Sequence, residues 1–457
     1  MNKIIAAVVV FFVSLSAYCQ DITGEWNGTL SVQGVKLRLV FHISRSVSGL
    51  EATMDSPDQG AKGLPVKTVS YSAPTLKLAL PNLGIEYEGI LGQNSVIDGT
   101  FKQGGMSFPL KLSKEKVVLK RPQEPSKPYP YIEEEVVFTN KKAGIKLAGT
   151  LTTPSKTGVY PAVVLISGSG AQNRDEELMG HKPFLVVADY LTRRGIAVLR
   201  YDDRGTAASG GDFSNATSAD FADDAEAALD YLKTRKEVIT DKIGFAGHSE
   251  GGIIAPMIAA RRPKDVGFII LLAGTGVRGD SLLLLQSETI LKVSGTDDEN
   301  IRNAQNLNRK IYRMVAQGVD SAAIRKEIAK SMAGTGQSEG ATTTIIESQI
   351  SRLSTPWFRY FIKYDPFPTL TKVKCPVLVM NGEKDVQVPA GINTKAIEKA
   401  LKQGGNNQVT VKLFPRLNHL FQECQTGLPG EYSSIEQTFA PEALETMSKW
   451  IETLLKK

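Results

Sequence analysis

The sequence has few of the residues that build metal sites or disulfide frameworks. Its 457 residues include only three cysteines and four histidines. No cysteines pair at metal-binding spacing, and the chain contains neither an H-E-x-x-H motif nor a Walker phosphate loop. These absences exclude the common structural zinc sites, the zincin proteases and the P-loop nucleotidases. We therefore expect a chain that needs no metal and no cofactor.

A strong excess of charge of one sign is also missing. The chain has 54 Lys and Arg against 48 Asp and Glu, and the two signs are interspersed. This distribution does not predict a nucleic-acid partner. Hydrophobic residues make up 42% of the chain, which is enough for a sizeable core, and the length favours two or three domains.

The apolar segment at the N-terminus is too short to span a bilayer. A basic start is followed by about a dozen apolar residues and then by Ser16 and Ala17, a pattern typical of a cleavable signal peptide. We predict a signal peptide over residues 1–19, export to the periplasm or the medium, and no stable membrane insertion. Of the cysteines that remain, Cys375 opens a predicted strand and Cys424 lies beyond the end of the next one, so we expect two unpaired thiols.

The most informative motif is G-H-S-E-G at residues 247–251. It follows the short apolar run 242–246 and precedes the apolar helical pattern 253–260. A serine in such a strand-to-helix turn adopts strained backbone angles, and the residues two before and two after it must be small. Gly247 and Gly251 meet that need, so we predict that Ser249 is a catalytic nucleophile.

A second G-x-S-x-G, at residues 336–340, lacks this context. Ser338 lies between the helical pattern 323–330 and the polar stretch 341–344, with no strand before it. We interpret it as part of a flexible loop. The pentapeptide alone is therefore not diagnostic in this glycine-rich chain.

A serine hydroxyl needs a base, normally a histidine oriented by a carboxylate. Of the four histidines, His419 is the candidate, because it follows the strand pattern 409–414 in a loop. In hydrolases with this turn the acid lies between the serine and the histidine in the chain. Asp385, after the apolar run 376–380, is our choice, and Glu383 in the same loop is its competitor.

From about residue 133 onward the chain resembles the α/β-hydrolase superfamily, in particular secreted two-domain bacterial carboxylesterases related to serine aminopeptidase-like hydrolases. The resemblance is carried by the nucleophile turn and by the stretches 167–175, 200–205, 355–361 and 381–385. It implies an α/β-hydrolase fold, with a mostly parallel sheet and a helical cap inserted at about 277–370, in a catalytic domain of residues 133–457.

The resemblance also implies an oxyanion hole made of two backbone N–H groups. One belongs to Glu250, which follows the nucleophile, and the other to the stretch 167–175, where we choose Ser169. Gly168 and Gly170 would let the backbone approach the substrate. Many hydrolases have His-Gly at this place, where this chain has Ser-Gly, which leaves open which amide of residues 168–170 donates. The charged residues nearby are expected to form structural ion pairs: Arg174, Asp175, Asp203 and Arg204.

The predicted cap supplies candidates for the substrate pocket. Trp357, Phe358 and Phe361 are spaced to line it, and Leu283 and Gln286 are weaker candidates in the first cap helix. The same aromatic spacing also fits a helix that simply packs into a core.

The segment 20–118 predicts a separate all-β domain. Short runs of period two alternate with turn residues, which favours roughly eight strands in a small antiparallel barrel or sandwich. This domain either binds a ligand or buttresses the catalytic half. A stiff linker follows at residues 119–132, where prolines and polar residues dominate.

Together these features predict a secreted serine hydrolase that cleaves carboxylic esters, of a small molecule or a glycan, through an acyl-enzyme. A serine peptidase of the same fold is the main alternative, although it would need an acidic pair in the cap to bind a substrate amino terminus. A second alternative is a binding protein with an inactive hydrolase half. Acyl length, alcohol group and oligomeric state do not follow from the sequence.

Overall fold

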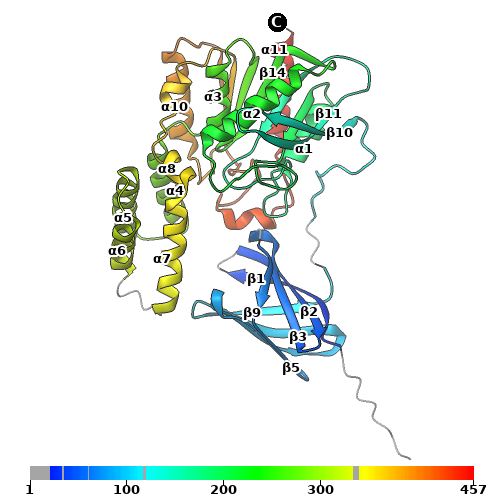
Figure 1. Cartoon of the computed structure of the whole chain (residues 1–457), viewed down its shortest axis with the longest axis vertical. Helices are drawn as coiled ribbons and strands as arrows, with labels where there is room; N and C mark the ends of the chain where they lie inside the picture. Colours follow the sequence, from blue (N-terminus) through cyan, green and yellow to red (C-terminus); the bar gives the residue numbers. More distant parts are fainter. Residues whose placement is uncertain (1–20, 33–34, 60, 117–119, 333–338, 457) are drawn as a thin grey trace, which may run out of the picture. The chain divides into compact units, whose positions relative to one another are not determined.

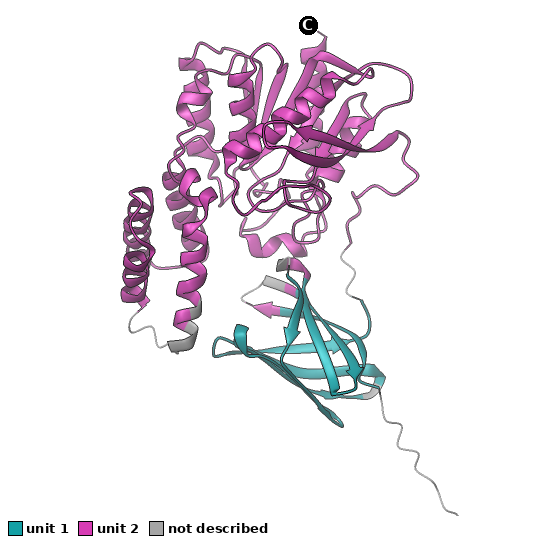
Figure 2. Ribbon diagram, viewed as in Figure 1, with its two compact units in different colours: residues 1–30, 38–56, 61–117 teal, residues 31–37, 57–60, 118–457 magenta. Residues whose placement is uncertain are grey.

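A computed structural model describes residues 21–32, 35–59, 61–116, 120–332 and 339–456 (Figure 1). The predicted signal peptide and Ser338 lie outside these residues. The chain divides between residues 117 and 118 into two compact units, the second of which also takes in 31–37 and 57–60 (Figure 2). Across the described ranges, no helix combines the length and the apolar character that a membrane crossing requires.

The first unit is built on an antiparallel sheet, as the period-two patterning predicted. Its described residues form nine strands in the order β4-β3-β2-β1-β9-β8-β7-β6-β5. Alternate side chains face inward, among them Trp26, Phe41 and Tyr87. The strands are β1 Gly24–Val32, β2 Val35–Ser46, β3 Gly49–Ser56, β4 Ala61–Val66, β5 Thr68–Ser72, β6 Thr75–Leu80, β7 Ile85–Leu91, β8 Val96–Gln103 and β9 Met106–Ser113.

There is one more strand here than the sequence suggested, and β4 explains the difference. Its sequence, AKGLPV, contains Gly63 and Pro65, both of which are unfavourable inside a strand. It pairs with β3 on one side and, as the terminal strand of the sheet order, tolerates a residue without an N–H donor.

The second unit contains a mixed sheet of eight strands in its described residues, in the order β10-β11-β13-β12-β14-β15-β16-β17. β11 pairs antiparallel with both β10 and β13, and the strands β12 to β17 run parallel to one another. This arrangement confirms the predicted α/β-hydrolase fold. The strands are β10 Ile132–Asn140, β11 Ile145–Thr153, β12 Tyr160–Ile166, β13 Ala197–Tyr201, β14 Val238–His248, β15 Phe268–Leu272, β16 Val377–Gly382 and β17 Val409–Phe414.

Helices cover both faces of this sheet, which is why its central strands are apolar throughout. Side chains of α2 (Ser218–Lys233), α3 (Gly251–Arg261) and α10 (Ala390–Gln403) pack against one face. Those of α1 (Pro183–Thr192) and α11 (Pro441–Leu455) pack against the other. The carboxyl ends of the parallel strands stay uncovered by these helices and carry the loops with the predicted catalytic residues.

The cap lies between β15 and β16 and contains six helices in its described residues (Figure 1). They are α4 Gly279–Val293, α5 Asp298–Ala316, α6 Ser321–Met332, α7 Glu339–Ser354, α8 Pro356–Phe361 and α9 Phe367–Leu370. The middle helices bury an apolar cluster of their own, which includes Ile311, Ile328, Ile350 and Phe358. The cap thus has an interior separate from the two faces of the sheet.

Three of the four predicted ion-pair residues are paired. Arg174 binds Asp202 at 2.8 Å, Asp175 binds Arg200, and Arg204 Nε lies 2.6 Å from Asp224 Oδ2. Asp224 is only 2% exposed and also accepts from Asn140 Nδ2 at 2.7 Å, which ties α2 to the end of β10. Asp203 forms no such pair among the described residues, and its role belongs to the site below.

Removing the Asp224 carboxylate leaves the buried Arg204 guanidinium with only the longer ion pair to Asp220 Oδ1, at 3.7 Å. We predict that Asp224→Ala lowers the free energy of unfolding by about 3–5 kcal/mol, measured by urea denaturation. Glu288→Ala is the matched control, because Glu288 pairs with Lys292 on an exposed helix surface, and such pairs contribute about 0.3–0.5 kcal/mol. Equal losses from the two variants would contradict this interpretation.

Candidate active site

Ser249 occupies a sharp turn between β14 and α3. Its φ of 52° lies in the left-handed region, and its N–H donates to Leu272 O at 2.8 Å. The turn closes only because its flanking residues have no side chain. A Cβ on Gly247 would lie 2.0 Å from Gly251 O, and a Cβ on Gly251 would lie 2.2 Å from Ile166 O. The backbone geometry is that of a strained nucleophile turn.

Asp385 and His419 lie together, each in the loop after its strand. His419 Nδ1 and Asp385 Oδ2 are 2.8 Å apart, and both side chains are buried. The other carboxylate oxygen of Asp385 accepts from the N–H groups of Gln387 and Val388, each at 2.8 Å. A carboxylate at Nδ1 keeps the ring proton on that nitrogen, so Nε2 is the basic one.

Glu383, the competing acid, does not take this place. Its side chain is exposed, and its backbone N–H donates to Phe414 O at 2.9 Å. The structure therefore brings Asp385 to the imidazole, while Glu383 faces solvent.

His248 connects the nucleophile turn to the loop of His419. The two imidazole ring centres are 4.8 Å apart, and His248 Nε2 donates to the His419 carbonyl at 3.0 Å. Within the described residues the Ser249 hydroxyl makes no protein hydrogen bond. Such contacts commonly tighten when substrate binds.

The partner of His248 on its other nitrogen is Glu176, which the sequence analysis did not single out. His248 Nδ1 lies 2.8 Å from Glu176 Oε1, so both ring nitrogens face acceptors, an arrangement that favours the protonated ring. Burial opposes that charge, but the Glu176 carboxylate outweighs it and raises the pKa of His248. The buried pair of His248 and Glu176 thus lies directly beside the predicted nucleophile.

Glu176 also decides which amides remain available for an oxyanion. Its Oε1 accepts from Gly168 N at 2.7 Å, so this N–H is already engaged. The N–H groups of Ser169 and Glu250 donate to no protein atom among the described residues. Since Glu250 lies at the N-terminal end of α3, the helix dipole favours negative charge at the same spot.

Asp203 holds the loop that carries Ser169, rather than forming the predicted ion pair. It accepts from Ser167 Oγ at 2.8 Å and from Gln172 N at 2.9 Å. Burial raises the pKa of Asp203 to about 8. The expectation of an ion pair was wrong because no cation within the described residues reaches this carboxyl, whose desolvation favours the neutral form.

A cavity of about 260 Å³ opens at Ser249 and gathers most of the predicted pocket. Gly168 and Gly170 do not line it. Its lining comprises Ser169, Ser249, Glu250, Thr275, Leu282, Leu283, Gln286, Arg352, Trp357, Phe358, Phe361, Gln387 and Val388. Of these, Thr275, Leu282, Arg352, Gln387 and Val388 were not predicted, because they come from four separate segments of the chain.

The side chain of Glu250 joins the core to the cap. It is buried and accepts from Ser218 Oγ at 2.5 Å and from Trp357 Nε1 at 2.7 Å. Burial raises the pKa of Glu250. Trp357 is thereby fixed over the cavity by a hydrogen bond as well as by stacking on Phe361.

Comparisons with known proteins identify the family. A family model described as X-Pro dipeptidyl-peptidase (S15 family) matches residues 143–413, which include Ser249 and Asp385 and end before His419. The esterase EstD of Thermotoga maritima is 28% identical over 280 residues, covering 60% of this chain and 58% of that protein. The chain therefore matches little more than half the length of this relative.

Solved structures of hydrolases also align with the chain. The α/β hydrolase GrgF from Penicillium sp. sh18 aligns with a TM-score of 0.44 and 15% identity, covering 71% of this chain and 98% of that one. An esterase of Pyrococcus furiosus aligns with a TM-score of 0.43 and 16% identity, covering 75% and 98%.

The contact between Asp385 and His419 generates a first prediction for the site. Asp385→Asn changes the ring tautomer that the acid favours, so we expect the turnover of a p-nitrophenyl ester to fall by a factor on the order of 10⁴. Glu383→Gln, two positions away in the same loop, is expected to keep turnover within about twofold, as usual for an exposed substitution. A larger loss in Glu383→Gln than in Asp385→Asn would show that Asp385 is not the acid.

The Glu176 and His248 pair generates a second prediction. Without the carboxylate, burial dominates, so Glu176→Gln is expected to lower the pKa of His248 below its ordinary value of 6.5. The ring signals of four histidines can be followed by NMR titration. The exposed neighbour gives the control Glu177→Gln, which leaves the titration unchanged.

The same pair makes stability depend on pH. Because the pKa of His248 is raised on folding, its stabilising contribution is present at low pH and is lost as the pH rises through that folded pKa. Glu176→Gln is expected to reverse the sign of this dependence, because a lowered pKa of His248 makes stability rise with pH up to the unfolded pKa. An identical His248 titration in the wild type and in Glu176→Gln would overturn the assignment.

Proposed function

The chain belongs to the S15 family, whose model is described as X-Pro dipeptidyl-peptidase, within the α/β-hydrolase superfamily, and we propose that it is a serine hydrolase that cleaves carboxylic esters. The observation that carries the proposal is the Asp385–His419 hydrogen bond in the loops beside the strained turn of Ser249. Export through the N-terminal segment and a small-molecule or glycan ester as substrate are part of the same proposal.

In the proposed reaction Ser249 Oγ attacks the ester carbonyl while His419 Nε2 takes its proton. The N–H groups of Ser169 and Glu250 bind the oxygen that becomes negative. When the tetrahedral intermediate collapses, the C–O bond breaks and the imidazolium returns its proton to the leaving alcohol. Water then attacks the carbonyl of the acyl-enzyme, with His419 again as the base. The bond between the acyl group and Ser249 Oγ breaks, His419 returns the proton to Ser249, and the free acid leaves. Asp385 orients the ring throughout.

The cavity favours esters over peptides with a free amino terminus. Recognition of a substrate ammonium requires an available carboxylate. Among the residues that line the cavity, the single carboxyl group is that of Glu250, which Ser218 and Trp357 already occupy and whose pKa is raised. The relative from Thermotoga maritima is named an esterase. A peptidase remains the alternative because the family model is described as one.

We predict that Ser249→Ala lowers kcat for a p-nitrophenyl ester by a factor on the order of 10⁴ to 10⁶. The matched control is Ser338→Ala, in the second G-x-S-x-G, for which we expect little change. A fluorophosphonate probe should label the wild type and the control but not Ser249→Ala. Equal losses from both substitutions would mean that Ser249 is not the nucleophile.

The choice between ester and peptide is tested on the wild-type enzyme. We expect kcat/KM for short p-nitrophenyl acyl esters to exceed that for aminoacyl amides. The reverse preference, together with labelling at Ser249, would establish the peptidase instead.

A further inference from the structure

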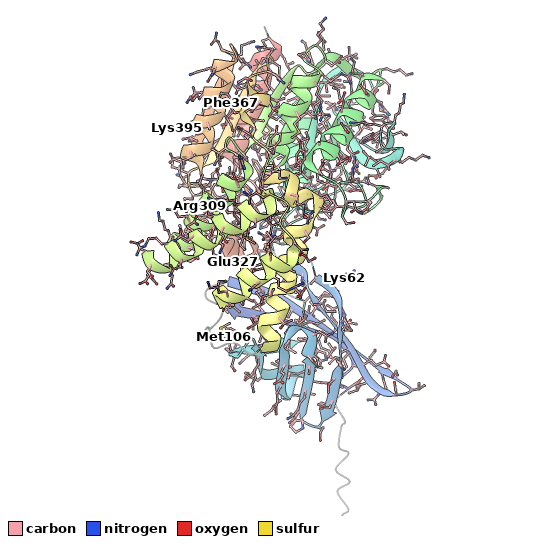
Figure 3. All side chains as sticks on the ribbon, turned by 60° about the vertical axis from the view of Figure 1, so that its left-hand side comes forward. Lys62, Met106, Arg309, Glu327, Phe367 and Lys395 are labelled. Carbon is pink, nitrogen blue, oxygen red and sulfur yellow. The ribbon has the colours of Figure 1, made fainter. Side chains whose placement is uncertain are left out.

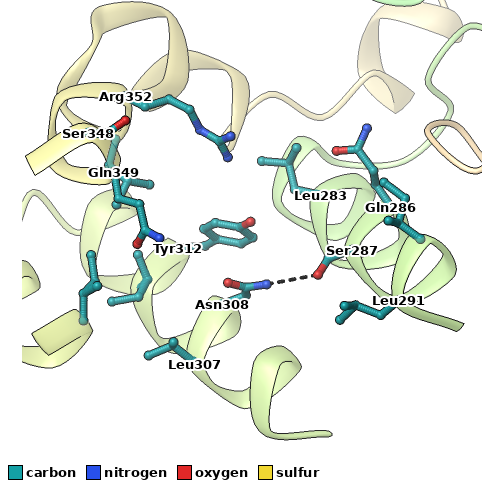
Figure 4. Close-up of a pocket in the computed structure, with 14 residues that line it drawn as sticks. Leu283, Gln286, Ser287, Leu291, Leu307, Asn308, Tyr312, Ser348, Gln349 and Arg352 are labelled. Atoms are coloured by element: carbon teal, nitrogen blue, oxygen red, sulfur yellow. Dashed lines mark hydrogen bonds between the residues drawn. The ribbon is translucent and has the colours of Figure 1, made fainter. Parts of the chain in front are cut away.

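A second cavity lies within the cap, beside the cavity that holds Ser249. It has a volume of about 420 Å³ and is formed by side chains of α4, α5, α6 and α7 (Figure 4). Leu283, Gln286 and Arg352 line both cavities. The two spaces therefore share a wall made of three side chains, so a group bound at Ser249 is next to the interior of the cap.

The lining of this second cavity is half aliphatic and half polar, and it carries one positive charge. Its aliphatic lining comes from Leu283, Ile290, Leu291, Leu307, Ile311, Ile328 and Leu353. The polar groups are hydroxyls and amides, of which Asn308 donates to Ser287 Oγ at 3.2 Å (Figure 4). Arg352 is the charged member of the lining. Such a space suits an extended carbon chain that ends in an anion.

Arg352 is free to bind an anion. Within the described residues it forms no ion pair, and its guanidinium lies 5.7 Å from the ring centre of Phe358. Figure 4 shows its side chain reaching across the cavity towards Leu283. The acids of the neighbouring cap helices have other partners: Glu288 binds Lys292 at 2.5 Å, Glu327 binds Lys310 at 2.6 Å and Glu347 binds Arg325 at 2.9 Å.

The position of His419 indicates which part of an ester would enter the cap. The leaving alcohol must stay within hydrogen-bond reach of the general acid. His419 lines neither cavity, whereas the shared wall comes from α4 and α7. The alcohol therefore belongs on the side of His419, and the acyl chain on the side of the cap.

We propose that the cap cavity is an acyl subsite for a chain that ends in a carboxylate, which Arg352 binds. The substrate class is then the half-esters of dicarboxylic acids. This inference rests on the proposed serine hydrolase activity, because it assigns the acyl side from the role of His419. A bidentate bond between guanidinium and carboxylate supplies the specificity.

The test compares p-nitrophenyl hemisuberate with p-nitrophenyl octanoate, whose acyl chains differ in the terminal carboxylate. We expect Arg352→Gln to lower the ratio of the two kcat/KM values by roughly two- to fivefold, because Arg352 is exposed and solvent screens its charge. Arg352→Lys should retain part of the preference. Arg309→Gln is the control, because Arg309 is an exposed cap arginine that lines neither cavity (Figure 3), and its ratio should equal that of the wild type.

Binding provides a readout independent of turnover. Calorimetry on Ser249→Ala should show monomethyl suberate binding more tightly than methyl octanoate, with the difference abolished by the added Arg352→Gln. If the wild type hydrolyses neither p-nitrophenyl ester but this binding difference is present, the proposed activity fails and the subsite stands. If both esters are hydrolysed while neither the ratio nor the binding responds to Arg352→Gln, the subsite is overturned.

Discussion

The approach of backbone to backbone around Ser249 is the constraint on which the site depends. Gly247 and Gly251 allow β14, the turn and α3 to lie closer together than any side chain would permit. The left-handed angle of Ser249 is held there by its bond to the end of β15. Strain of this kind persists only where the surrounding structure over-determines it, and here the parallel sheet does so from both sides. Ser249 is thus partly accessible at the end of a strand rather than buried along it.

The ionisable groups around this turn are mostly carboxyl groups. Glu176, Asp385 and Glu250 are buried carboxyl groups in this region, and Asp203 is a partly buried one. The structure accommodates them in different ways: Asp385 by backbone N–H groups and an imidazole, Glu176 by the imidazole of His248, whose pKa is raised, and the other two by pKa values raised towards the neutral form. The raised pKa values of Asp203 and Glu250 favour their neutral forms, which would limit the repulsion of a negative charge formed at Ser249.

Sequence patterns predicted what depends on local order along the chain. The strand, turn and helix around Ser249 and the strands before Asp385 and His419 have periodicity and turn residues of their own. Glu176 lies 72 positions from His248, and no period or spacing relates the two. Arg352 belongs to a polar helix whose charges look like those of any solvated surface. Asp203 stands next to Arg204, yet the two side chains enter different environments. These residues gain their roles only from tertiary neighbours.

The cap packs its own apolar cluster, apart from the residues that support the sheet. Selection for substrate specificity can therefore act on the cap, and selection for stability on the residues that support the sheet. Mutations in the cap helices can change which substrates bind, while the sheet and its helices, which position the reactive groups, keep their stability. A protein organised in this way can change its specificity through the cap without losing the stability of its main domain.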